Sequence, residues 1–232
     1  NNYYQMDLNF YDAIKEFNNK KINYWVCHGS LLGLARDGKL IPWDHDADIA
    51  IWENEYSKNY IIEIFKLIGF EFNKDHPKGS LNFKRKGGRS IDVNLYKQSD
   101  NLRNLVSALH LVPNTIVFDI LDRIVNKKKF NGKSFYLTIF NFIKIFRIFL
   151  IPPYHLLNKF GFLYSYKGYS TPKDLLIEFI DFDYFGISCR IPKMYKSINS
   201  YIYGDNWIIP IKKYNWMKDS HSVISKDLKI NS

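Results

Sequence analysis

The sequence has few cysteines and few acidic residues. Two cysteines, Cys27 and Cys189, occur in 232 residues, too few for a disulfide framework, and they lack the paired spacing of a metal site. We expect both to be core thiols in a reducing compartment. Acidic residues number 23 against 33 Lys and Arg, which gives a formal net charge of +10. A basic chain attracts nucleotides, nucleic acid or an anionic membrane, and charge alone does not choose among them.

Targeting signals, internal repeats and low-complexity linkers are also missing. The chain opens on a polar, aromatic stretch, 1–6, without an initiator Met, so it can be a piece of a longer protein and a missing signal decides little. Aromatic residues are abundant instead, with 17 Tyr, 18 Phe and 5 Trp. Such rings can fill a core, line a sugar or nucleotide site, or lie at a membrane interface.

Hydrophobic periodicity predicts a sheet covered by helices. Phe10, Ala13, Ile14 and Phe17 recur at helical spacing, whereas 46–52 alternates like a half-buried strand. In chain order we predict a helix over 6–19, a strand over 24–28, a helix from 31, a strand over 46–52, a helix around 61–68, and strands over 70–72, 81–86 and 90–96. This order predicts an α+β or α/β domain, with a β-sheet covered by helices.

The chain beyond residue 100 has a different character. Residues 101–126 are predicted to be helical, with a break at Pro113. A strongly apolar helix is predicted over 134–151, ended by Pro152 and Pro153. We therefore expect a helical insertion over about 101–165 and a separate C-terminal part over 166–232.

Acidic residues gather in one predicted strand and in a later one. Asp44, Asp46 and Asp48 are spaced by two, so Asp46 and Asp48 project from the same face of a strand. Asp92 lies in a later strand whose apolar residues face the other way. Carboxylates this close repel one another unless a cation lies between them, and Mg²⁺ or Mn²⁺ prefers such oxygen ligands together with substrate phosphates. The pattern predicts a metal site on Asp46, Asp48 and Asp92.

Two other interpretations of the acidic run remain open. The acids can simply solvate a loop or cap a helix. They can also form a calcium loop, although no Gly and no bidentate Glu follow at the required spacing. The apolar continuation 49–51 favours a strand over a loop.

Gly29 and Ser30 follow the first predicted strand and precede a helix. A Gly at this position lets a phosphate approach the backbone, and the helix N-terminus offers free N–H groups. The Ser30 hydroxyl can donate a hydrogen bond to a phosphate oxygen. A Gly-Ser pair by itself is more often an ordinary turn, and its value comes from occurring together with the acidic strands.

The segment from His28 to Ile49 resembles the LicD/fukutin-type phosphotransferases of the nucleotidyltransferase superfamily. The matching residues are His28-Gly29-Ser30-Leu31-Leu32-Gly33, Arg36, Gly38-Lys39 and Ile41-Pro42-Trp43-Asp44-His45-Asp46-Ala47-Asp48-Ile49. Tyr203, Gly204 and Trp207 resemble the C-terminal signature of the family. The resemblance covers 24–96 and about 195–215, and it departs from bacterial members at His45, a position that is often acidic there.

The resemblance implies a fold, a reaction and roles for the acids. It implies an α+β fold in which a nucleotidyltransferase-type mixed β-sheet is flanked by helices, with the catalytic core over 1–100 completed by the C-terminal part. Asp46 and Asp48 would hold Mg²⁺ (or Mn²⁺) against the donor pyrophosphate, with Asp44 as a supporting acid. Asp92 would bind metal and take the proton of the acceptor. The donor would be a CDP-activated alcohol, the acceptor a glycan hydroxyl, and the product CMP.

Basic and aromatic residues complete the predicted substrate site. Arg36 is the first choice for the donor phosphate because its planar fork matches phosphate, ahead of Lys84 and Arg89, which can equally lie on a solvated hairpin. Trp43 can stack on a base or sugar, or pack beneath the acidic loop. A structural role is expected for His28, while Tyr203 and Trp207 either close the site or belong to the core.

The apolar segment 134–151 carries a second hypothesis. It is short for a membrane span and holds Lys144 and Arg147, so an interfacial helix on an anionic leaflet fits better. The alternative is a helix buried against the rest of the protein. These expectations place the protein in the cytoplasm, peripheral to the inner face of the membrane.

Other functions stay open beside the phosphotransferase. A nucleotidyltransferase would use the same metal site to move NMP from an NTP to a small hydroxylated acceptor. A non-catalytic nucleotide- or membrane-binding module is disfavoured by the intact acids. No nucleic-acid partner is expected, since the sequence has no recognition motif for one.

Overall fold

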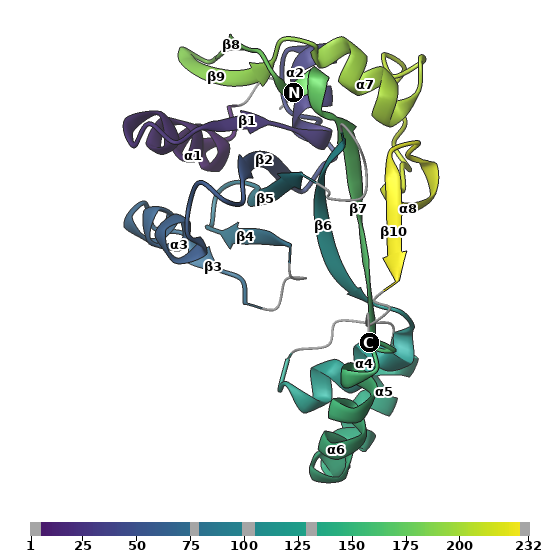
Figure 1. Cartoon of the computed structure of the whole chain (residues 1–232). Coiled ribbons are helices and arrows are strands. Elements are labelled where there is room, and N and C mark those ends of the chain that lie inside the picture. The colour runs from purple at the N-terminus through teal and green to yellow at the C-terminus, as the bar shows by residue number, and fades with distance from the viewer. Residues whose placement is uncertain (1–5, 75–78, 99–104, 129–133, 228–232) are drawn as a thin grey trace. The chain divides into compact units, whose positions relative to one another are not determined.

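The computed structural model describes residues 6–74, 79–98, 105–128 and 134–227 (Figure 1). The chain divides into two compact units. One combines 1–109 with 168–223, and the other combines 110–167 with 224–232. Asp44, Asp46, Asp48 and Asp92 all lie in the first unit, and the apolar segment 134–151 lies in the second.

The sheet is mixed, as the sequence predicts. Its strand order is β1-β2-β5-β6-β7-β10, with β4 also paired to β5 and β3 paired to β4. The bounds are β1 Tyr24–Val26, β2 Asp46–Trp52, β3 Glu71–Phe72, β4 Ser80–Lys84, β5 Ser90–Gln98, β6 Leu105–Pro113, β7 Tyr164–Pro172 and β10 Val223–Asp227. Strands β2 and β5 are parallel, whereas β1–β2, β4–β5 and β5–β6 are antiparallel. The parallel pair β2–β5 carries the acidic residues.

Three helices of the first unit match the predicted apolar periodicities. The helix α1 (Leu8–Asn19) buries Phe10, Ala13, Ile14 and Phe17, and the Asp7 side chain caps its N-terminus. The helices α2 (His28–Asp37) and α3 (Lys58–Leu67) follow β1 and β2. Helix α2 begins three residues earlier than predicted, so the Gly-Ser pair lies inside its first turn. Gly38 ends α2 with φ 67°, a left-handed conformation that glycine adopts without strain.

The C-terminal part of the first unit packs on this core. It holds a short 3₁₀ helix, η2 (Lys173–Leu176), the hairpin β8 (Phe179–Tyr184) and β9 (Ile187–Pro192), and helices α7 (Tyr195–Tyr203) and α8 (Trp216–Asp219). Strand β9 lies against β1 and α1, and α7 packs on α2. Both cysteines are buried and free, as predicted.

The prediction of one helical stretch over 101–126 was wrong. Residues 105–113 form strand β6, and only α4 (Ile116–Val125) is helical. Val106 and Ala108 are fully buried in the main core, and Ala108 pairs with Tyr96 of β5. A free edge of β5 receives this segment, and such long-range pairing outweighs local propensity.

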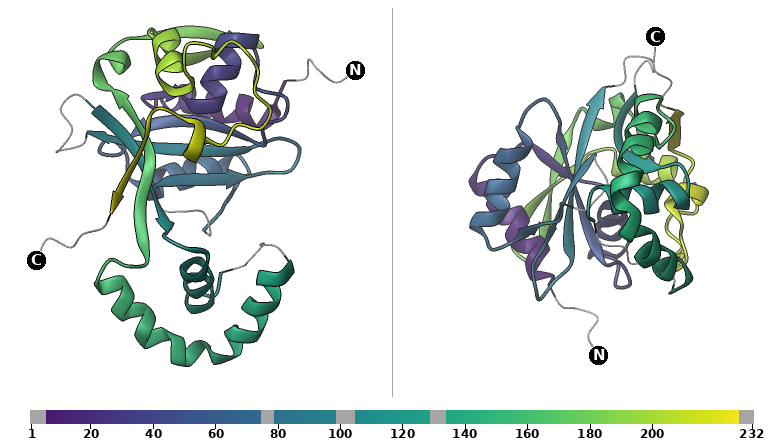
Figure 2. Two further views of the ribbon diagram at one scale, coloured as in Figure 1. Left: turned by 90° about the vertical axis from the view of Figure 1, so that its right-hand side faces the viewer. Right: turned by 90° about the horizontal axis from the view of Figure 1, so that it is seen from below.

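The predicted apolar helix is longer and bent. It consists of α5 (Ser134–Ile143), a 3₁₀ turn η1 (Lys144–Phe146) and α6 (Arg147–Lys159). Pro152 and Pro153 lie inside α6 and do not end it, contrary to the prediction. A proline removes an N–H and bends a helix, and this segment follows an arc around α4 (Figure 2).

Candidate functional site

The register of β2 and β5 brings the acids of two strands together. Asp48 and Asp92 are directly paired in the parallel ladder, and Asp46 is paired with Ser90. Neighbouring strands lie about 4.8 Å apart, so the Asp48 and Asp92 side chains are neighbours on one face of the sheet. Both are partly exposed, whereas Ala47, Ile49 and the residues flanking Asp92 are buried on the other face.

A third strand extends this row of polar residues. Asn82 of β4 is paired with Asp92, and its amide donates a hydrogen bond to Asp92 Oδ1. The Asn94 amide, two residues along β5, donates to Asp48 Oδ1 at 3.1 Å. Two amides therefore hold one oxygen of each acid and fix the direction of both carboxylates.

The first turn of α2 approaches the acids closely. A Cβ added at Gly29 would lie 2.7 Å from Asp44 Oδ2 and 3.8 Å from Asp48 Oδ2. Any larger residue would displace the Asp44 carboxylate. The free N–H groups and partial positive charge of a helix N-terminus favour anions, so this turn suits carboxylates and a phosphate alike.

The acids are crowded enough to resist ionisation. Burial, followed by the charges of Asp46 and Asp92, raises the pKa of Asp48 well above its ordinary value. Burial and the neighbouring Asp46 carboxylate raise the pKa of Asp44 to about 6. A divalent cation would relieve this repulsion, so the donor set suits a hard, oxygen-preferring metal such as Mg²⁺.

The carboxylates do not already form a coordination shell. Among the residues that the structure describes, no group of three or more His, Cys, Asp or Glu side chains is arranged to hold a metal ion. The hydrogen bonds from Asn82 and Asn94 each engage one carboxylate oxygen, that of Asp92 and that of Asp48. Metal binding by Asp46, Asp48, Asp92 and Asp44 thus stays a prediction.

Ser30 contacts the backbone of Asp48. The Ser30 side chain is buried, and its Oγ accepts a hydrogen bond from the Asp48 amide N–H at 2.8 Å. This bond ties the first turn of α2 to β2. The hydroxyl that the sequence assigned to a phosphate therefore has a positioning contact in this structure.

Arg89 fastens the loop before β2 to the start of β5. Its Nη2 donates to the Ile41 carbonyl at 2.8 Å and its Nε to the Asp44 carbonyl at 3.1 Å. Its Nη1 pairs with Asp7 at 3.3 Å. The guanidinium is thus occupied by protein groups, and the residue orients the acidic loop.

The other predicted phosphate ligands differ in position. Arg36 lies in the last turn of α2, about 10 Å along the helix from Gly29, and its guanidinium pairs with Asp37 at 2.7 Å. Lys84 is exposed at the end of β4, two residues beyond Asn82 and on the same face. Of the two, Lys84 lies on the face of the sheet that carries Asn82, whereas Arg36 lies at the other end of α2 from Gly29.

Trp43 lies in the loop before β2 with 37% of its surface exposed. The Lys212 ammonium lies 5.7 Å from the centre of its ring. A segment far along the chain thus brings a cation beside the acidic loop. Lys212, Asn82 and Asn94 are not predicted as site residues, because nothing in their local sequence marks them.

Aromatic side chains pack around the start of α2. His28 is buried, has φ 47°, and stacks on Tyr169 with ring centres 4.1 Å apart. Tyr96 OH lies 3.3 Å from His28 Nε2. Burial raises the pKa of Tyr203, with smaller contributions from Tyr169 and Asp48. These contacts agree with a structural role for His28.

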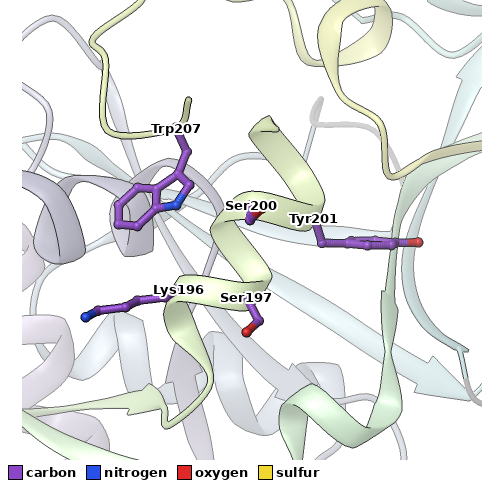
Figure 3. Close-up of a pocket in the computed structure, with 5 residues that line it drawn as sticks. All are labelled: Lys196, Ser197, Ser200, Tyr201 and Trp207. Carbon is purple, nitrogen blue, oxygen red and sulfur yellow. The ribbon is translucent and has the colours of Figure 1, made fainter. Parts of the chain in front are cut away.

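Trp207 lies on a different surface. It lines an open cavity of about 500 Å³ over α7 (Figure 3), together with Lys196, Ser197, Ser200 and Tyr201. None of the acids lines this cavity. Two of the three residues of the C-terminal signature, Tyr203 and Trp207, therefore lie in different surroundings.

The range that contains strands β2 and β5 is similar to a known protein family. The family described as LicD/FKTN/FKRP, nucleotidyltransferase domain, matches residues 21–110. Ribitol 5-phosphate transferase FKRP of Mus musculus and that of Homo sapiens are each 55% identical to this chain over 31 residues. That stretch is 13% of this chain and only 6% of either relative.

Two solved structures show distant similarity. The lincosamide antibiotic adenylyltransferase LnuA, bound to lincomycin, aligns with 80% of this chain and 78% of its own at 12% identity and a TM-score of 0.39. The antibiotic-resistance factor ANT(2'')-Ia aligns with 65% of this chain and 94% of its own at 10% identity and a TM-score of 0.33. The range of the family match includes Asp44, Asp46, Asp48 and Asp92. Residues 21–110 belong to the LicD-type nucleotidyltransferase domain family.

Proposed function

We propose that this chain is a metal-dependent phosphotransferase. It would move a phospho-alcohol, either phosphocholine or a polyol phosphate, from a CDP-activated donor to a hydroxyl of a cell-surface glycan. The acceptor oxygen forms the new bond to phosphorus, the bond to CMP breaks, and the hydroxyl proton passes to a carboxylate. The observation that carries this proposal is the pairing of Asp48 with Asp92 beside the first turn of α2.

Asp46, Asp48 and Asp92 would hold Mg²⁺, with Asp44 in support. When bound, the metal would neutralise charge on the transferring phosphate. The chain's own groups then position the reactants. The N–H groups in the first turn of α2, near Gly29, would donate hydrogen bonds to phosphate oxygens of the CDP-activated donor, and Asp92 would take the proton of the acceptor hydroxyl. Phosphoryl transfer depends mainly on positioning and charge neutralisation, which this arrangement supplies.

Basic side chains near the acids would serve the donor. Lys84, at the end of β4, and Lys212, beside the Trp43 ring, are both exposed and would be candidates to contact a donor phosphate. Trp43 offers a partly exposed ring for the cytosine or the sugar. The FKRP relatives are ribitol 5-phosphate transferases, which supports a polyol phosphate as the transferred group.

The test is a ligand screen followed by product analysis. The thermal stability of the chain with Mg²⁺ is measured with CDP-choline, CDP-ribitol, CDP-glycerol and NTPs, because a ligand that binds the native state raises its melting temperature. We expect a rise with at least one CDP-alcohol and CMP as the nucleotide product. Pyrophosphate released from an NTP would instead identify a nucleotidyltransferase and reject the proposal.

A pair of variants separates chemistry from folding. Asp92→Asn removes the proposed base, while Glu63→Gln changes an exposed acid on α3. We expect CMP release to disappear in the first and to persist in the second at equal melting temperature. Equal turnover in both would contradict the assigned base.

A further inference from the structure

The second unit carries a large apolar surface on its helical arc. We call it the outer apolar face. Its members are Phe135, Phe142, Ile145, Phe146, Ile148, Phe149, Leu156 and Phe160. Each is 47–74% exposed. Soluble proteins seldom expose so many neighbouring large apolar side chains, so this face indicates a contact with something apolar.

The opposite side of the same arc is already satisfied. Phe140 packs with Ile120 and Ile124 of α4, and Tyr154 packs with Val125 and Leu163. Figure 2 shows the arc of α5, η1 and α6 curving around α4. The helices therefore have one apolar side for their own core, and the outer apolar face is additional to it.

A buried polar cluster fixes the arc on α4. Tyr154 and Tyr164 both donate hydrogen bonds to Asp122 Oδ1, and Lys128 pairs with Asp122 at 2.9 Å. Arg147 donates to the Val125 carbonyl at 2.8 Å. Such satisfied, directional contacts hold the outer apolar face outward.

Charge complements this face. Residues 110–167 hold nine Lys and Arg but only two acids, Asp119 and Asp122. Asp119 is paired with Arg123 and Asp122 with Lys128. The segment that carries the outer apolar face therefore has nine positive and two negative side chains, a net +7 of the chain's formal +10.

A lipid surface is the occupant that fits both properties. Protein interfaces with an apolar core are depleted of charge, and two copies of this face would bring like charges together. An anionic leaflet offers hydrocarbon to the rings and phosphates to the lysines. We propose that the outer apolar face is an interfacial anchor for an anionic membrane.

The arc lies along the membrane in this proposal. Residues Phe135–Lys159 are long and apolar enough to cross a membrane by length and composition, with a mean hydropathy of 1.6 over the best window and 6% of it buried. However, the segment is bent, carries Lys144 and Arg147 near its middle, and contains two prolines. A bent helix with central charges suits the headgroup boundary better than the hydrocarbon centre. The anchor does not depend on the proposed reaction.

The test is co-sedimentation of the full chain with vesicles. Vesicles of phosphatidylcholine alone are compared with vesicles that also contain 30 mol% phosphatidylglycerol, a fraction of about one third chosen to give a strong surface potential. We expect binding to the anionic vesicles and at least roughly tenfold weaker binding to the neutral ones. No binding to anionic vesicles would overturn the proposal.

A matched pair of double variants locates the contact. Ile148→Ser with Phe149→Ser removes two members of the outer apolar face that are 71% and 74% exposed. Leu67→Ser with Ile177→Ser removes two side chains of the first unit that are 75% and 65% exposed. We expect roughly tenfold or greater loss of vesicle binding in the first pair only. Equal loss in both would overturn the assignment of the face.

Two further measurements guard against misfolding and self-association. Phe149→Trp places the first tryptophan in the segment 110–167, and its emission should shift to the blue with anionic vesicles and be quenched by brominated lipid. An unchanged emission would overturn the proposal. Light scattering tests the alternative of a dimer. If the unchanged chain is a dimer, the double variant Ile148→Ser with Phe149→Ser is a monomer, and neither binds vesicles, the outer apolar face contacts a second copy instead.

Discussion

The Ser30 hydroxyl accepts a hydrogen bond from the Asp48 amide N–H at 2.8 Å. This contact joins the first turn of α2, the proposed phosphate site, to β2, which carries Asp46 and Asp48 of the proposed metal site. The two halves of the candidate site are therefore held in fixed relation by one buried side chain. It is a contact that changes in sequence can test directly.

Replacing Ser30 with Ala removes the acceptor and leaves a buried N–H without its partner. We expect the free energy of unfolding to fall by about 1–3 kcal/mol, the usual cost of an unsatisfied buried group. Urea denaturation measures this change. Ser197→Ala, an exposed serine on α7, is the matched control and should alter stability little. A loss of the same size in both would remove the special role of Ser30.

Asp48→Asn should abolish turnover without unfolding the chain. We expect kcat to fall by roughly 100-fold or more, because a metal ligand is lost from the site. The melting temperature without metal should not fall, since burial and the charges of Asp46 and Asp92 already disfavour ionised Asp48. Steady-state kinetics and calorimetry measure both. Retained turnover would contradict the metal assignment.

Arg89→Ala should loosen the loop that carries Asp44. It breaks the hydrogen bonds to the Ile41 and Asp44 carbonyls and the ion pair with Asp7, and we expect a loss of about 2–3 kcal/mol in the free energy of unfolding. Arg89→Lys should recover only part, because an ammonium cannot span the same acceptors. Lys86→Ala, an exposed neighbour, should be neutral in urea denaturation. Full recovery by lysine would argue against the fork geometry.

The crowded acids should make stability depend on pH. The folded-state pKa of Asp44 is raised to about 6 and that of Asp48 is also raised. The pKa of an Asp in the unfolded chain is about 3.9, so between about pH 4 and pH 6 the folded state binds more protons than the unfolded state. The stability from protonation is complete below about pH 4 and is lost as the pH rises through about 6.

Mg²⁺ should change that dependence. We expect the metal to raise the melting temperature at pH 7.5 and to have much less effect at pH 5, where protons compete for the carboxylates. Thermal melts with Mg²⁺ and with EDTA at both pH values measure this. Asp48→Asn should abolish the rise at pH 7.5. If Mg²⁺ raised the melting temperature of Asp48→Asn equally at pH 7.5 and pH 5, the metal would bind at another site.

The first unit shows where local sequence was sufficient. The apolar spacing from Phe10 to Phe17 predicted the buried face of α1, and the alternation over 46–52 predicted β2 with Asp46 and Asp48 on its less buried face. In both cases a single element with one buried face sets the pattern. Local periodicity reports such a face directly.

Local sequence failed where a distant partner decides the outcome. Residues 105–113 became a strand because an edge of β5 was available to pair with them. The hydrogen bonds of Arg89 to the carbonyls of Ile41 and Asp44 likewise join residues far apart in the sequence, and its role toward a phosphate stays a prediction. Asn82 and Lys212 joined the site from β4 and from the C-terminal loop, without any mark in their own sequence.

The sequence by itself determined the acidic strand, the Gly-Ser turn beside it and the apolar segment, because each is a local pattern of side chains along one element. Only the tertiary structure decided that Asp48 pairs with Asp92, that Ser30 supports Asp48, and that one side of the apolar arc is covered by α4 while the other is exposed. Strand register and helix packing join residues far apart in the chain, and their energies depend on the whole fold.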